Sequence, residues 1–380
     1  MPPDVLPANL IRPALADVAP YQPGRPVDDL RRELGLERIV KLASNEGPHP
    51  PFPGARAAIA AEAARTRVYP DPGCWALRDA LSARLDVDAA RILVGNGADS
   101  LIKLLCLATL DPGDEIAMCW PSFLSWRQGA GIQGATVRAA GLAADGSYDL
   151  DALAREITPR TKLVVVVSPN NPTGQAVTAD ALERFLDRVP PHVLPVIDEA
   201  YFEYLPAGGH DAVGLIRAGR QIVALRTFSK AYGLAGLRVG YMVASEPLLA
   251  ALARVRNAFD VNAVAQAAAL ASLGDGDTLL APRMAEIATE RAMTASGLRA
   301  LGLEPLPSTA NFLLVPMGSP ERATAVNEAL LRQGVIVRPA GPFGAPDCLR
   351  ITIGFAHENA IMLAALAGAL METAASPLSR

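Results

Sequence analysis

The chain is poor in the residues that bind metals or form disulfides. Its 380 residues include only four cysteines and four histidines, and neither type shows the close pairing typical of a zinc site. We therefore expect no metal. The cysteines are predicted to be reduced thiols, mostly buried, of a cytoplasmic protein.

A strong charge bias and a long apolar run are also missing. Lysine and arginine number 35 against 39 acidic residues, which gives no electrostatic reason to expect a nucleic-acid or anionic-membrane partner. No run of about 18 apolar residues occurs, so no membrane span is expected. The proline-rich N-terminal stretch has no basic region before an apolar one, unlike a secretory signal.

Apolar residues are abundant instead. They make up 51% of the chain, and 380 residues exceed what one hydrophobic core usually organises, so we expect two closely associated domains. The pattern predicts an N-terminal arm over 1–50 that joins the small domain, a large α/β domain over 51–265 and a small α+β domain over 266–380.

Helix-like and strand-like segments alternate in the large domain. Residues 163–167 are apolar throughout, as expected for a strand covered on both faces. Such alternation predicts an α/β fold with a mostly parallel sheet between helices. We expect helices at 54–65, 75–85, 98–110, 178–188 (with Thr178 as N-cap), 246–259 and 263–300, and strands at 91–94, 115–119, 162–167, 194–197, 222–225, 239–243, 311–315, 335–337 and 349–353.

Polar clusters follow four of these strands, at the edge where open α/β sheets build their sites. The first, at 95–100, reads Gly-Asn-Gly-Ala-Asp-Ser and leads into an apolar helix. Small residues let the backbone approach a ligand, and the first helical turn offers N–H groups to a phosphate. Taken alone, the cluster is also consistent with a glycine turn capped by Asp99.

The second and third clusters place amides and a carboxylate at strand ends. Asn170 and Asn171 stand in a proline-bounded turn, where an amide can be aimed at a ligand oxygen, although Asn-Pro is also a common turn former. Asp198 ends a buried strand and needs a partner, because an unpaired buried carboxylate is costly. A protonated pyridine nitrogen would be such a partner.

The fourth cluster, at 227–240, sets a lysine among aromatic residues and glycines. Ser229 and Arg238 suit a phosphate, since they offer a hydroxyl and a fork of N–H donors. Lys230 suits a carbonyl group, with which it can form a Schiff base, and it can also act as a general base. Four such clusters in this order are not explained by structure alone.

At these residues the sequence resembles the fold-type I family of pyridoxal 5′-phosphate (PLP) enzymes, specifically its class I/II aminotransferases and, within them, the histidinol-phosphate aminotransferase branch. The motifs are Asn-Asn-Pro-Thr-Gly at 170–174, Asp-Glu-Ala-Tyr at 198–201 and Ser-Lys-x-x-Gly-x-x-Gly-x-Arg at 229–238. The resemblance covers nearly the whole chain. It implies the PLP-dependent transferase fold, with a large-domain sheet of the seven-stranded type, and PLP as the cofactor.

The resemblance also implies roles at the cofactor. Lys230 would bind PLP covalently and move the substrate proton, Asp198 would pair with the pyridine nitrogen, and Asn171 and Tyr201 would hydrogen-bond the phenolic oxygen. Phe123, with Trp126 as the alternative, would stack on the ring. The phosphate would be held by Gly97, Ala98, Asp99, Ser229 and Arg238.

Further residues are implied on the substrate side. Arg350 matches the arginine that binds an α-carboxylate, and Arg338 matches a second substrate arginine suited to a phosphate or acidic end, with a surface salt bridge as its alternative. Tyr21 and Asn45 match substrate positions of the arm. Tyr69 falls where the family reaches the cofactor phosphate of a partner, which implies a homodimer with shared active sites.

Several departures from the branch leave the substrate open. Gly47 and Asp260 stand where asparagine is usual, Phe343 where tyrosine is common and Ser100 where glutamate is usual, and Asp260 adds a negative charge unfavourable to a phosphate. The main hypothesis is transamination of histidinol phosphate with glutamate/2-oxoglutarate. An aminotransferase for aromatic or other amino acids is one alternative, and a PLP-dependent decarboxylase or lyase of a phosphorylated amino acid is the other.

Overall fold

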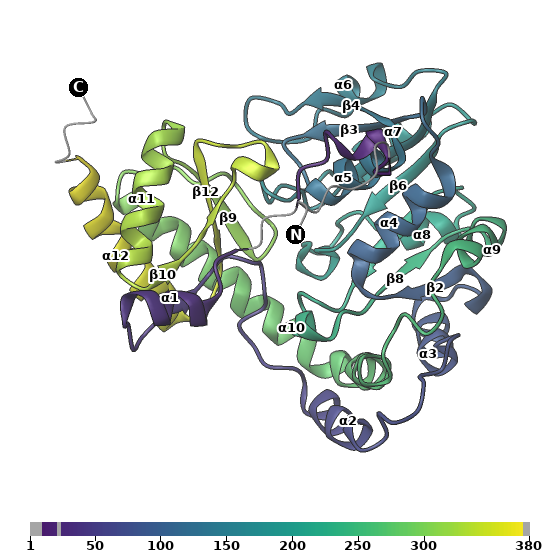
Figure 1. Ribbon diagram of the computed structural model, residues 1–380, viewed down its shortest axis with the longest axis horizontal. Coiled ribbons are helices and arrows are strands. Elements are labelled where there is room, and N and C mark those ends of the chain that lie inside the picture. Colours follow the sequence, from purple (N-terminus) through teal and green to yellow (C-terminus); the bar gives the residue numbers. More distant parts are fainter. Residues whose placement is uncertain (1–9, 21–23, 375–380) are drawn as a thin grey trace, which may run out of the picture.

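The computed structural model describes residues 10–20 and 24–374. They form a larger part around a seven-stranded sheet and a smaller part around a three-stranded sheet, side by side (Figure 1). One 38-residue helix, α10 (Ala263–Ala300), belongs to both parts. Its first half contacts helices of the large part and its end contacts α12 (Ala356–Ala374) of the small part. The boundary predicted between 265 and 266 therefore falls within the first turn of α10.

The large sheet has the strand order β2-β8-β7-β6-β5-β3-β4. The five strands from β4 to β7 run parallel, whereas β8 is antiparallel to both of its neighbours. The prediction of a mostly parallel α/β sheet is therefore confirmed. The strands are β2 (Ile92–Gly95), β3 (Glu115–Trp120), β4 (Thr136–Gly141), β5 (Thr161–Val167), β6 (Leu194–Asp198), β7 (Val223–Thr227) and β8 (Gly240–Val243).

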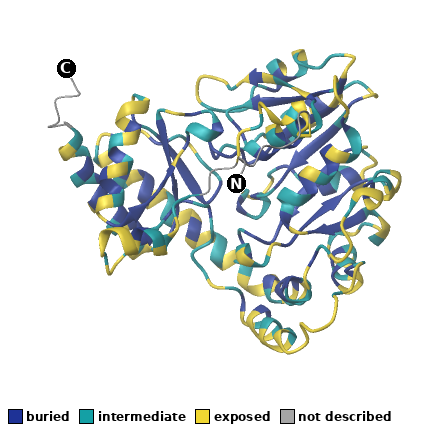
Figure 2. Cartoon of the chain, viewed as in Figure 1, coloured by how far each residue is buried: buried dark blue, intermediate teal, exposed yellow. Residues whose placement is uncertain are grey.

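Helices cover both faces of this sheet because its strands are apolar on both sides. In β5, Val164 and Val166 join the core on one face, and Leu163 and Val165 join the core on the other. Figure 2 shows the central strands buried between partly exposed helices. One face carries α4 (Gly97–Thr109), α5 (Leu124–Gln133) and α9 (Glu246–Val255); the other carries α3 (Trp75–Leu85), α6 (Leu150–Arg155), α7 (Ala179–Leu186) and α8 (Ala212–Arg217), with α2 (Pro53–Ala63) packed on α10.

The small part contains strands from both ends of the chain. β1 (Val40–Lys41) of the N-terminal arm pairs in parallel with β10 (Val335–Ile336). β9 (Phe312–Pro316), β12 (Cys348–Thr352) and β11 (Arg338–Pro339) form an antiparallel sheet. α1 (Val27–Leu34), α11 (Pro320–Arg332) and α12 flank these strands (Figure 1).

Most predicted elements lie within one to three residues of their observed positions. Thr178 caps α7 by accepting a hydrogen bond from the Ala181 N–H at 3.2 Å, as predicted. The helix expected at 246–259 ends earlier, at Val255. β4 was not predicted, because this edge strand is partly exposed and has no apolar run. Among the described residues, no helix has the length and apolarity that crossing a membrane takes.

Candidate active site

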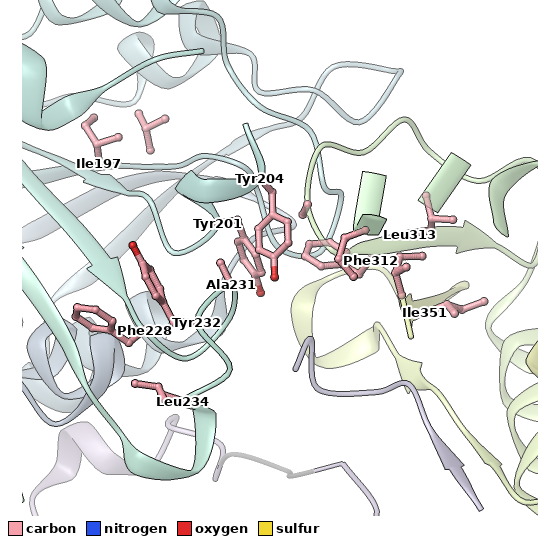
Figure 3. Close-up of a cluster of buried hydrophobic side chains, with 14 of the residues drawn as sticks. Ile197, Tyr201, Tyr204, Phe228, Ala231, Tyr232, Leu234, Phe312, Leu313 and Ile351 are labelled. Carbon is pink, nitrogen blue, oxygen red and sulfur yellow. The ribbon is translucent and has the colours of Figure 1, made fainter. Parts of the chain in front are cut away.

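A cavity of about 390 Å³ lies where the carboxyl ends of the large sheet meet the small part. Figure 3 shows this junction, with Tyr201 of the large part facing Phe312 of β9. The two rings meet edge to face with their centroids 5.2 Å apart. Predicted site residues that line the cavity are Asn45, Ala98, Asp99, Phe123, Asn171, Asp198, Tyr201, Ser229, Lys230, Arg238, Arg338 and Arg350.

Lys230 lies in the loop after β7 and points its amine into the cavity. Its Nζ donates to the Ser44 carbonyl at 3.2 Å and lies 5.8 Å from the centre of the Tyr201 ring. Burial lowers the pKa of this amine to about 8, and the positive charge of Arg350 adds to the effect. A substantial fraction of the amine is therefore uncharged at physiological pH, as a nucleophile or proton acceptor requires.

Asp198 ends β6 and is 2% exposed. The indole Nε1–H of Trp126 donates to its Oδ2 at 2.9 Å, and the Ala200 N–H donates to its Oδ1 at 3.2 Å. Burial raises the pKa of Asp198 to about 6, against the lowering effect of the Trp126 hydrogen bond. Trp126 is fully buried and does not line the cavity, so it holds the carboxylate in place from outside the cavity.

A buried ion pair lies beside Asp198 and fixes the same strand end. Glu199 accepts from Arg226 Nε at 2.8 Å and from His210 Nδ1 at 3.0 Å. The other ring nitrogen of His210 lies 2.7 Å from the Ser168 hydroxyl, at the end of β5. This network ties the ends of β5, β6 and β7 together, directly behind the residues that face the cavity.

Four predicted side chains form two hydrogen-bonded pairs across the two parts, Asn45 with Tyr201 and Asn171 with Arg350. Asn45 has φ 55 and donates through Nδ2 to the Tyr201 hydroxyl at 2.8 Å. Its backbone N–H donates to the Thr352 hydroxyl at 2.9 Å. Asn171 accepts from Arg350 Nη1 at 2.6 Å. Asn170 stabilises its own loop instead. Its side-chain oxygen accepts from the Ser122 hydroxyl, and its side-chain nitrogen donates to the Pro121 carbonyl and the Thr173 hydroxyl.

The start of α4 and the loop after β7 bring together N–H and hydroxyl donors that suit an anion. A Cβ atom on Gly97, which has φ +76, would lie 2.5 Å from Arg238 Nη2, so only glycine lets the guanidinium lie there. Arg238 Nη1 also lies 3.4 Å from the Ser229 hydroxyl. Asp99, in the first turn of α4, accepts from the Ser125 hydroxyl and lies 3.4 Å from Lys103 Nζ.

Two arginines line the opposite end of the cavity. Arg338 on β11 and Arg350 on β12 are direct partners across the antiparallel pair and are 6% and 4% exposed. Arg350 also donates to the Ala43 carbonyl at 2.8 Å. Because directly opposed residues project to the same face, both side chains extend from the same side of the sheet, and both line the cavity. The burial of Arg338 is unlike that of a surface salt bridge.

One predicted site residue lies outside the cavity, and another is not among the described residues. Tyr69 is 80% exposed and stacks on Phe259 at 4.6 Å, away from the cavity of its own chain. Tyr21 falls outside the described residues. Phe123, just before α5, lines the cavity, in agreement with a ring-stacking position, whereas Trp126 does not.

The departures from the branch have separate structural consequences. A Cβ atom on Gly47 would lie 2.8 Å from the Lys230 carbonyl oxygen, so glycine permits a close approach of the arm to the lysine loop. Asp260 forms an ion pair with Arg256 at 2.5 Å and does not line the cavity. The negative charge of Asp260 is thus offset by Arg256, and its effect on a phosphate substrate stays a prediction. Ser100 bonds back to the Gly97 carbonyl within α4 at 3.1 Å.

The cavity fits PLP on grounds of its own chemistry. The buried Asp198 carboxylate can offset a protonated ring nitrogen, and the α4 start with Arg238 can hold a phosphate. Lys230 supplies an amine with a lowered pKa between these two sites. When bound, PLP supplies an aldehyde that condenses with amines and a ring that withdraws electrons.

Comparison with known proteins identifies the same chemistry. The family model for aminotransferase class I and II matches residues 37–368. Histidinol-phosphate aminotransferase 2 of Ralstonia nicotianae is 46% identical over 94% of this chain and 96% of its own, and histidinol-phosphate aminotransferase of Anaeromyxobacter sp. is 43% identical over 94% and 98%.

Solved structures agree with the sequence relatives. The PLP complex of histidinol-phosphate aminotransferase from Sinorhizobium meliloti has a TM-score of 0.88 at 28% identity, covering 96% of this chain and 98% of its own. An aspartate aminotransferase mutant from Thermus thermophilus has a TM-score of 0.80 at 27% identity, covering 90% and 94%. The chain belongs to the aminotransferase class I and II family and is a PLP-dependent aminotransferase of fold type I.

Proposed function

We propose that this enzyme transfers the amino group of L-histidinol phosphate to 2-oxoglutarate, giving imidazole acetol phosphate and glutamate. The observation that carries the proposal is the opposed pair Arg338 and Arg350 at the substrate end of the cavity. Two buried guanidinium groups suit the phosphate of one substrate and a carboxylate of the other. The names of the relatives, which are 40–46% identical over most of the chain, support the same substrate.

The proposal assigns the remaining steps to residues at the cofactor end. Lys230 takes and returns the proton at the substrate carbon, since its amine faces the cavity and its pKa is lowered to about 8. Asp198 keeps the cofactor ring nitrogen protonated. Tyr201, fixed by Asn45 at 2.8 Å, and Asn171 bind the phenolic oxygen. The Gly97 turn, Ala98, Asp99, Ser229 and Arg238 hold the cofactor phosphate.

The proposal also includes a homodimer in the cytoplasm. The dimer is supported by large apolar side chains that are exposed near the start of α3 and beyond the end of α9. These residues are Val68, Tyr69, Trp75 and Phe259. In the dimer, Tyr69 reaches the cofactor phosphate of the partner. Four free and buried cysteines are consistent with a reducing compartment. Sedimentation of the purified protein tests the dimer directly.

Half-reactions test the substrate. PLP-loaded enzyme is mixed separately with L-histidinol phosphate, L-phenylalanine and L-glutamate, and the absorption band of lysine-bound PLP is followed as it converts to that of pyridoxamine phosphate. We expect conversion with histidinol phosphate and with glutamate. Conversion with phenylalanine but not histidinol phosphate would assign a different amino donor, and carbon dioxide release without a keto acid would assign a decarboxylase.

A further inference from the structure

Phe343 lies beside the two arginines of the cavity. It ends the short 3-10 helix at Gly341–Phe343, which joins β11 to β12, and its side chain is 2% exposed. Its ring centre is 5.5 Å from Arg338 Cζ and 4.9 Å from Arg350 Cζ. One phenyl ring therefore contacts both guanidinium groups.

The turn that carries Phe343 is tightly held. The Phe343 N–H donates to the Ala340 carbonyl at 3.0 Å, and Ala345 donates to the same oxygen at 3.1 Å. Gly344 follows with φ +96, and a Cβ atom there would lie 2.3 Å from Trp120 Nε1. These contacts fix the backbone position from which the Phe343 ring extends toward the two arginines.

The ring offsets electrostatic repulsion between Arg338 and Arg350. Like charges directly opposite each other on antiparallel strands repel, and burial strengthens the repulsion. The negative face of an aromatic ring attracts a guanidinium group and competes for no hydrogen bond. Phenylalanine also has no hydroxyl, so it adds no further acceptor beside the two guanidinium groups.

We propose that Phe343 determines specificity in this cavity: by holding the guanidinium groups of Arg338 and Arg350 side by side, it favours donors that carry a doubly negative phosphate over donors that carry only a carboxylate. The inference rests on the proposed function, since it concerns the same substrate end. Loss of the ring lets the two cations move apart, which lowers the affinity for a dianion more than that for a monoanion.

The test compares Phe343→Leu and Phe343→Met, which remove the ring, with Phe343→Tyr, which keeps it. Half-reaction kcat/KM is measured for L-histidinol phosphate and for L-glutamate. We expect the ratio of the two constants to fall about 10-fold in the Leu and Met variants, mainly through KM, and to stay within about 3-fold in the Tyr variant. Phe52→Leu is the matched control, because the Phe52 ring contacts Arg283 at 4.0 Å outside the cavity.

A second measurement does not depend on turnover. Calorimetric titration of the PLP-loaded proteins with inorganic phosphate and with acetate gives the ratio of the two anion affinities. This ratio should fall in the Leu and Met variants as the kcat/KM ratio does. An equal loss for both donors and both anions in the Leu and Met variants would show that Phe343 is only a packing residue, and the inference would fail. If wild type reacts with no phosphorylated donor, the proposed function fails, while the phosphate-to-acetate ratio still tests Phe343.

Discussion

The two ends of the cavity are assembled in different ways. The cofactor end comes from one sheet: Gly97 follows β2, Asp198 ends β6 and Lys230 follows β7. The substrate end comes from the arm and the small sheet, through Asn45, Arg338 and Arg350. The cofactor end therefore forms when the large part folds, whereas the substrate end exists only when the two parts are packed together.

This difference separates two kinds of failure. A change at the cofactor end affects chemistry with every donor, because all donors use the same cofactor. A change at the substrate end affects donors according to their charge and leaves the cofactor in place. The following variants, ordered by expected effect, test whether the two ends can be separated in this way.

Lys230→Ala has the largest expected effect. It removes the amine that binds the cofactor and moves the proton, so kcat should fall by at least about 10³-fold with every donor. PLP should remain bound without a covalent link, since the phosphate site and Asp198 are intact. Stopped-flow half-reactions and the absorption spectrum measure both effects. Lys162→Ala, on an exposed lysine of β5, is the control; full activity of the Lys230 variant would refute the assignment.

Arg350→Ala should come next, with an effect confined to the substrate end. It leaves the Asn171 amide and the Ala43 carbonyl without their donor, and it removes half of the cation pair. We expect a loss of about 2–5 kcal/mol in the transition-state binding measured by kcat/KM for glutamate, with PLP still bound. The exposed pair of Arg332 and Glu372 provides a control in Arg332→Ala. An unaltered glutamate half-reaction would contradict the role of Arg350.

Trp126→Phe tests the support behind the cofactor end. The variant lacks the N–H donor to Asp198, so the ionised carboxylate is less stabilised and its pKa rises further above about 6. Since only ionised Asp198 holds the ring proton, PLP affinity should decline as pH falls through 6 in wild type and from a higher pH in the variant. Between the two pKa values, where only the wild-type carboxylate is ionised, we expect binding weaker by about 10- to 100-fold in the variant, and above both values the two affinities should converge.

The readout for Trp126→Phe is the dissociation constant of PLP, measured by absorbance over a series of pH values. Trp120→Phe, on a tryptophan at the end of β3 that does not line the cavity, controls for the loss of an indole. The same pH profile in wild type and the Trp126 variant would mean that the hydrogen bond does not govern the ionisation of Asp198.

Asp260→Asn has the smallest expected effect. It restores the residue usual in the related branch but breaks the ion pair with Arg256. We expect a loss of about 1 kcal/mol or less in the free energy of unfolding. The donor preference should stay within about 2-fold, because Asp260 does not line the cavity. A marked gain for histidinol phosphate would show that Asp260 acts on the substrate after all.

The sequence indicated the residues of the cofactor end for a local reason. Each residue of that end follows a strand within a few positions, so the strand pattern places it at the sheet edge. The helix cap at Thr178 and the burial of β5 on both faces were predicted for the same reason, because each depends on a few neighbouring residues in the sequence. β4 was missed because an edge strand with exposed residues leaves no such pattern.

Contacts across the chain could not be read in the same way. Asn45 bonds Tyr201 over 156 residues, and no local pattern links the two. Trp126 and Asp198 are 72 residues apart, yet a signal existed: a buried indole needs an acceptor, and a buried carboxylate needs a donor. The position of Phe343 beside two arginines depends on the β11–β12 register, and the two residues of β11 are too few to show a pattern that predicts this register.

The pairing of β1 with β10 has a consequence for synthesis on the ribosome. Val40 emerges early but pairs with Val335, about 300 residues later in the chain. At a translation rate of 5–20 residues per second, the arm waits roughly 15–60 s for its partner strand. The nascent chain can therefore complete the large sheet first. Strand β1 of the arm then pairs with β10 once β10 has been translated.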